Sequence, residues 1–168
     1  MEAVGDPETH MPSVYIETTV PSYYHETRRT AEAIAWRAVT RRWWDSYRHA
    51  YQLCTSRFVL AELMDAPATK RARALRMLAG VSILEEPPEL ENVASFYVEQ
   101  RAMPAEAAGD AYHLAMASLH KLDFLLTWNC RHLANANKIR HLTILNGRLG
   151  LPLPVLTTPQ LLLPEEAS

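Results

Sequence analysis

Short β-branched or apolar segments alternate along this chain with segments of helical length, and this alternation limits the folds open to it. Strands are expected at 13–17, 51–55, 81–84, 123–127 and 155–157. Helices are expected at 27–50, 57–65, 69–80, 89–101, 105–121 and 130–137, with a loop from Thr18 through Pro21 and an extended or turn-like stretch at 142–145. Strands separated by such helices are typical of βαβ units whose parallel sheet is covered on both faces. The sequence therefore predicts an α/β fold.

The size and charge of the chain are those of one ordinary globular domain. Its 168 residues are enough to bury about two-thirds of the unfolded surface. The formal net charge of −2 gives no general attraction to nucleic acid. Basic residues nevertheless gather in two expected helices: Arg28, Arg29, Arg37, Arg41, Arg42 and Arg48 in the first, and Lys70, Arg71, Arg73 and Arg76 in the second. Such a surface can hold a polyanion, although charge alone favours two solvated helix faces.

Cysteine content and hydropathy indicate the cellular compartment that suits this protein. Cys54 and Cys130 are too few for a disulfide framework, which favours a reducing compartment. The longest apolar runs fall short of the roughly 18 residues of a membrane span, so we expect a cytoplasmic protein without membrane contact. Residues 1–10 are expected to be a poorly ordered extension, with one domain over 11–164 and a tail at 165–168. Met11 is a candidate for the true start.

Oxygen-bearing side chains occur where a parallel sheet would bring them to one edge. They are Glu17 at the end of the first strand, Glu62 in a short helix, Asp110 at the start of a long helix and Asn129 after the fourth strand. Sites in open parallel sheets lie beyond the carboxyl ends of the strands. Oxygen ligands suit a hard cation such as Mg²⁺ or Mn²⁺. The four together favour a metal site for phosphoryl-transfer hydrolysis.

Each of these residues also has a simpler interpretation. Glu17 taken alone is a loop acid or a helix cap, and Asn129 alone is a cap. Glu62 alone is a surface acid, and for Asp110 capping and metal binding are about equally favoured. Asp123 is excluded from the site because the strand that it begins separates it from Asn129 by roughly 20 Å.

Motifs for other chemistries are missing from the sequence. The five glycines form neither a phosphate-binding loop nor a dinucleotide fingerprint, and no serine lies in a nucleophile elbow. The histidines show no i, i+4 pair that would indicate zinc. Metal-assisted hydrolysis therefore remains the favoured chemistry.

Four segments together resemble the PIN-domain ribonucleases, in particular the VapC-like toxins of type II toxin–antitoxin systems. They are VYIETTVPSYY at 14–24, SRFVLAEL at 56–63, DAYHLAMA at 110–117 and DFLLTWNCRHL at 123–133, with VLTTPQL at 155–161 matching the last strand of the family. Each segment alone is degenerate, but their order is fairly specific and they span nearly the whole domain.

The resemblance implies a PIN-like three-layer sandwich with a mainly parallel sheet of four to five strands flanked by helices. It implies Mg²⁺ or Mn²⁺ held by Glu17, Glu62 and Asp110, with Asn129 as the fourth catalytic position, and hydrolysis of RNA phosphodiester bonds. It also implies a homodimer and a cognate antitoxin. Two residues depart from the family pattern, because the first acid is usually Asp rather than Glu17 and the fourth position is often Asp rather than the neutral Asn129.

Two other functions remain open. One is a catalytically weak PIN-like module that binds RNA or a protein partner, which the two departures would explain. The other is an acid-dependent phosphatase acting on small phosphate esters. That class needs a nucleophilic Asp after the first strand, where this chain has Glu17.

Overall fold

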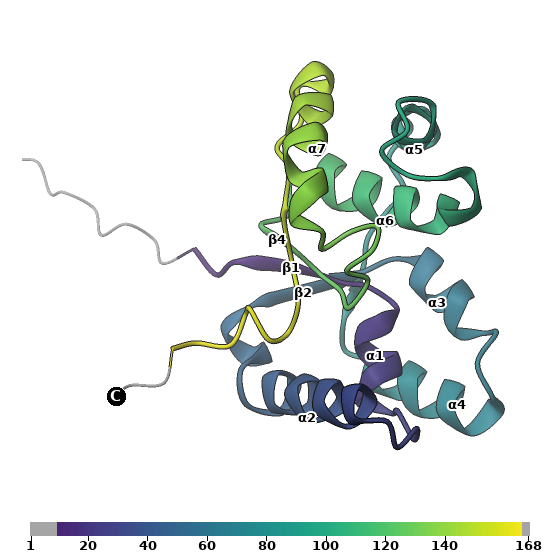
Figure 1. Cartoon of the computed structure of the whole chain (residues 1–168), viewed down its shortest axis with the longest axis vertical. Helices are drawn as coiled ribbons and strands as arrows, with labels where there is room; N and C mark the ends of the chain where they lie inside the picture. The colour runs from purple at the N-terminus through teal and green to yellow at the C-terminus, as the bar shows by residue number, and fades with distance from the viewer. Residues whose placement is uncertain (1–9, 166–168) are drawn as a thin grey trace, which may run out of the picture.

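The computed structural model describes residues 10–165, and its centre is a five-stranded sheet in which every pairing is parallel (Figure 1). The strands are β1 (Ser13–Ile16), β2 (Gln52–Thr55), β3 (Ser82–Ile83), β4 (Phe124–Leu126) and β5 (Val155–Thr157), in the spatial order β3-β2-β1-β4-β5. All the strands expected from the sequence are present, so the predicted α/β class is confirmed. The expected N-terminal extension and C-terminal tail lie almost wholly outside the described residues.

Strand β1 lies at the middle of the sheet and carries no exposed residue. Val14 pairs with Leu53 of β2 on one side and with Phe124 of β4 on the other. Val14, Tyr15 and Ile16 are all fully buried. A strand covered on both faces has no solvent side, which explains why its sequence is continuously apolar rather than alternating.

Helices cover both faces of this sheet. They are α1 (Thr19–Tyr24), α2 (Ala31–Ser46), α3 (Arg57–Leu63), α4 (Ala68–Met77), α5 (Leu90–Glu99), α6 (Ala108–Leu119) and α7 (Ala136–Leu149), with short 3₁₀ helices at Arg48–Ala50 and Ala105–Ala107. Figure 1 shows α5, α6 and α7 on one side of the sheet and α1, α2 and α4 on the other. The result is a three-layer arrangement. None of the helices within residues 10–165 combines the length and apolar character needed to cross a bilayer.

The structure corrects three of the expected segments. The loop expected after the first strand is the helix α1, in which Pro21 lies in the first turn, where a proline costs no hydrogen bond. Most of the helix expected at 130–137 is a turn, since α7 begins only at Ala136, and the stretch 142–145 that looked extended lies inside α7. Leu142 and Leu145 are buried one turn apart, which is a helical spacing.

Ser56 precedes α3 as expected for an N-cap residue, but its side chain makes no capping bond. The Ser56 hydroxyl instead pairs with the hydroxyl of Tyr15 at 2.6 Å, inside the protein. This hydrogen bond connects the start of α3 to β1, the strand that Glu17 follows.

Candidate metal centre

Glu17 is a buried carboxylate at the carboxyl edge of the sheet. It follows β1, and its backbone N–H donates to Leu126 O of β4 at 3.1 Å, which extends the strand pairing by one residue. Its side chain is almost completely enclosed, with 2% of the residue exposed. Oε2 accepts hydrogen bonds from the Thr127 hydroxyl at 2.8 Å and from the backbone N–H and hydroxyl of Thr19. Burial raises the pKa of Glu17, and the charge of His113 and the threonine hydrogen bonds offset only part of that rise.

The side chain of Glu62, in α3, lies close to that of Glu17 and contacts His113 of α6. Its Oε1 lies 2.5 Å from Nε2 of His113, whose ring is fully buried. Burial raises the pKa of Glu62, but the hydrogen bond and charge of His113 outweigh it, so that the pKa is lowered overall. For His113, burial lowers the pKa, and the bond to Glu62 with the charges of Glu17, Glu62 and Asp110 raises it above its usual value.

The other nitrogen of His113 continues a chain of buried polar groups. Nδ1 lies 2.7 Å from the hydroxyl of Tyr15, which in turn lies 2.6 Å from Oγ of Ser56. Burial raises the pKa of Tyr15 far above the physiological range, so its hydroxyl keeps its proton. These hydrogen bonds form a series that runs from Ser56, before α3, through Tyr15 in β1 and His113 in α6. The series ends at Glu62 in α3, which it holds in place.

Glu17, Glu62 and His113 form one compact cluster of ligand atoms. One carboxylate oxygen from each acid and one ring nitrogen all lie within 4.8 Å of one another. Sequence reasoning missed His113, because a single histidine in the apolar stripe of a helix is usually a core residue. Its spacing was the available signal, since three residues after Asp110 it lies one turn further along the same helix.

Asp110 and Asn129 form a pair beside this cluster. Asn129 Nδ2 donates to Oδ2 of Asp110 at 3.0 Å, while its Oδ1 accepts from the backbone N–H groups of Arg131 and His132. Asn129 thus both caps a turn and holds the acid. Burial raises the pKa of Asp110, and the charges of His113 and His132 and the bond from Asn129 lower it in part. Asp110 is not among the three residues that converge within 4.8 Å.

The donor set fits a divalent cation. Three carboxylates gather around one imidazole, and burial, with a smaller contribution from the charge of Glu62, raises the pKa of Asp110. The Thr18 side chain, between Glu17 and α1, also acts on Glu62 and lowers the pKa of that acid. Buried charges of one sign are costly unless a cation or hydrogen bonds compensate them. Carboxylate oxygens with one imidazole nitrogen are ligands for Mg²⁺, Mn²⁺ and related ions.

A close approach by backbone helps to fix Glu62. Gly109 begins α6 with Ala108, and a Cβ atom at that position would lie 3.2 Å from Glu62 Oε1. The missing side chain lets α6 pack directly against the carboxylate. Asp123, excluded on sequence grounds, accepts from the N–H of Ser13 at 2.8 Å, at the beginning rather than the end of β1. It therefore lies at the opposite edge of the sheet.

Several of the basic residues singled out in the sequence hydrogen-bond to the backbone or line a cavity. Arg37 donates to Glu26 O at 3.1 Å and Arg41 to Tyr24 O at 2.9 Å, so these side chains hold the connection between α1 and α2. Arg73 and Arg76 of α4 line a cavity of about 260 Å³ with His25. Arg41, Arg73 and Arg76 nevertheless remain exposed, so these contacts do not remove them from the basic surface.

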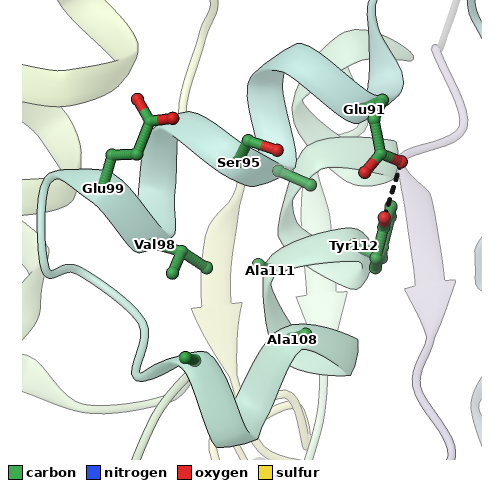
Figure 2. A pocket seen from close by; sticks show the side chains of 9 residues that line it. Glu91, Ser95, Val98, Glu99, Ala108, Ala111 and Tyr112 are labelled. Carbon is green, nitrogen blue, oxygen red and sulfur yellow. Dashed lines mark hydrogen bonds between the residues drawn. The ribbon is translucent and has the colours of Figure 1, made fainter.

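A separate cavity of about 300 Å³ lies between α5 and α6, and none of the candidate ligands lines it. Figure 2 shows its small apolar floor at Ala108 and Ala111. At its rim Tyr112 donates to Glu91 Oε2 at 2.6 Å (Figure 2). Without a converging set of polar groups, it offers no second centre for chemistry.

The comparisons with known proteins identify no family. No protein-family model matches the chain, and no curated protein matches it. Among solved structures, it is similar to a chain in the crystal structure of FitAcB from Neisseria gonorrhoeae, with 19% sequence identity, coverage of 70% of this chain and 88% of that chain, and a TM-score of 0.40. A similarity of this size supports no conclusion about function, which depends on the site.

Proposed function

We propose that this protein is a metal-dependent endoribonuclease that hydrolyses RNA phosphodiester bonds with Mg²⁺ or Mn²⁺. The observation that carries the proposal is the convergence of Glu17, Glu62 and His113 at the carboxyl edge of a parallel sheet, with Asp110 beside them. The PIN-like motifs of the sequence supply the substrate class. We further propose the role of a toxin in a toxin–antitoxin pair, acting in the cytoplasm as a homodimer.

Glu17, Glu62 and Asp110 would hold the metal, and the surrounding residues would keep these acids ionised and in place. Thr19 and Thr127 direct Oε2 of Glu17, His113 directs Glu62, and Asn129 directs Asp110. A bound divalent cation would lower the pKa of a water molecule and stabilise the charge that develops on the phosphate. Glu17 is buried and Asp110 is half-buried, so solvent screens their charges less than that of the exposed Glu62, which strengthens their hold on a cation.

A second candidate is a PIN-like module that binds RNA or a protein partner and cleaves weakly or not at all. Two features favour it: Asp110 lies outside the 4.8 Å cluster, and the neutral Asn129 occupies a position that is often acidic in the resembling family. This candidate predicts weak metal affinity and no loss of function on Asp110→Asn. A phosphatase is disfavoured, since Glu17 stands where its nucleophilic Asp is needed.

The decisive experiment is incubation of purified protein with a mixed RNA pool in Mg²⁺, in Mn²⁺ and in EDTA. Asp110→Asn is tested beside Asp65→Asn, which makes the same change at an exposed acid near the end of α3. Cleavage that needs metal, disappears in Asp110→Asn and persists in Asp65→Asn is the expected result. Equal traces of cleavage in all three proteins would indicate contamination and favour the binding module.

The toxin role needs a separate test. Induced expression in bacteria should arrest growth with the wild-type protein and with Asp65→Asn, and should not do so with Asp110→Asn. Growth arrest by all three proteins would contradict a role that depends on this site.

A further inference from the structure

We propose that His113 is itself a metal ligand through Nε2, which makes the centre a mixed nitrogen–oxygen site that prefers Mn²⁺ to Mg²⁺. The inference rests on the proposed function only in requiring that a divalent cation binds here. It concerns which atoms hold the ion and not what is then hydrolysed.

The first argument is geometric. Nε2 of His113 and one oxygen each of Glu17 and Glu62 lie within 4.8 Å of one another. Two ligands on opposite sides of a cation lie about 4.2 Å apart, and adjacent ligands about 3 Å apart, for bonds of about 2.1 Å. The contact of 2.5 Å between Nε2 and Glu62 Oε1 needs to open only slightly to admit an ion. The atoms are therefore close to coordination distances without movement of the backbone.

The second argument is the hydrogen bond on the far side of the ring. Metal-binding histidines nearly always donate their other N–H to a polar partner, which sets the tautomer and the ring orientation. Nδ1 of His113 has such a partner in the Tyr15 hydroxyl at 2.7 Å, and that hydroxyl is in turn hydrogen-bonded to the Ser56 hydroxyl at 2.6 Å. In the tautomer with the proton on Nδ1, the lone pair of Nε2 points toward Glu62 and Glu17.

The third argument concerns burial. The ring of His113 is fully buried, and its two nitrogens contact only Tyr15 and Glu62 among the hydrogen-bonding groups of residues 10–165. Imidazole nitrogen binds transition-metal ions better than it binds Mg²⁺, which strongly prefers oxygen. A site that includes Nε2 therefore favours Mn²⁺.

The test uses Mn²⁺ alone, without RNA, on the full chain. Electron spin echo spectra of the Mn²⁺-loaded protein are compared between natural-abundance protein and protein grown with ¹⁵N-histidine. A nitrogen ligand gives modulation that changes with the isotope. We expect that change in the wild type and in His132→Gln, and its loss in His113→Gln. His132 is the matched control because its charge also acts on Asp110.

Affinity measured by calorimetry supplies the second readout. His113→Gln should raise the Kd for Mn²⁺ by about tenfold or more while changing that for Mg²⁺ by less than about threefold. Absence of isotope-dependent modulation in the wild type would overturn the proposal, and this result does not depend on whether any variant folds. Loss of the signal in His132→Gln instead of His113→Gln would also overturn it. Failure of the protein to cleave RNA would affect the proposed function and leave this result standing.

Discussion

The side-chain amide of Asn129 donates a hydrogen bond to the carboxylate of Asp110 across 3.0 Å, joining the end of β4 to the start of α6. The amide thus compensates part of the charge of an acid whose pKa is raised by burial. A carboxylate at position 129 would have no proton to donate and would repel Asp110.

Asn129→Asp should therefore destabilise the metal-free protein, by about 1–2 kcal/mol, because a charged hydrogen bond is replaced by repulsion. Addition of Mn²⁺ should recover more stability in this variant than in the wild type. Urea unfolding with and without Mn²⁺ measures both effects. Asn135→Asp is the control, because Asn135 caps α7 and its side chain hydrogen-bonds, within the described residues, to backbone groups of Asn137 and Arg131 and not to an acid. Equal destabilisation by the two substitutions would contradict the assigned role of Asn129.

Thr127→Val removes a hydroxyl that donates to Glu17 Oε2 at 2.8 Å and accepts from the N–H of Asn129 at 2.9 Å. We expect a loss of about 1–3 kcal/mol in unfolding free energy and about tenfold weaker Mn²⁺ binding, as for changes to groups that orient metal ligands. Thr55→Val is matched in burial, since Thr55 donates to Ile16 O and touches no carboxylate. It should lose comparable stability with an unchanged Kd, and a similar Kd change in both variants would refute the assignment.

Gly109→Ala brings a Cβ atom to 3.2 Å from Glu62 Oε1, which must move. Helix propensity favours the alanine by about 1 kcal/mol, so any weakening of metal binding reflects the contact and not the helix. Calorimetry should show several-fold weaker Mn²⁺ binding. Gly147→Ala in α7 meets no atom within 4 Å and should stabilise the protein by about 0.5–1 kcal/mol without changing the Kd. Unchanged Mn²⁺ affinity in Gly109→Ala would show that Glu62 does not bind the ion.

Glu26 gives the protein a pH-dependent contribution to stability far from the site. The Arg28 side chain, with backbone N–H groups of Thr27 and Arg28 and the charge of Lys70, lowers the pKa of Glu26 to about 2. Because the folded-state pKa is depressed, this stabilisation is fully present above the unfolded value near 4.5 and is lost as the pH falls toward 2.

Glu26→Gln should therefore be less stable than the wild type at pH 7 and nearly equal to it near pH 2. Unfolding by urea across this pH range measures the difference. Glu85→Gln makes the same change at an exposed acid and is the control. A constant difference between Glu26→Gln and the wild type at all pH values would contradict the ionic origin of the effect.

The strands and most of the helices were predictable because each depends on local pattern and length. Helix α1 was not, since its six residues are too few to show periodicity and Thr18 and Pro21 indicated a loop. A helix was expected at 130–137 because Asn129 looked like a helix cap, whereas Asn129 caps a turn and binds Asp110. Local signals therefore failed where a side chain had a distant partner.

The sequence by itself determined the order of strands and helices, and with it the edge of the sheet where Glu17 and Asn129 would end their strands. Only the tertiary structure decided that His113 joins Glu17 and Glu62. The histidine contacts Tyr15 and Glu62, which lie 98 and 51 residues away in the chain. Such contacts arise when α3 and α6 pack beside the end of β1, and no periodicity in the sequence encodes them.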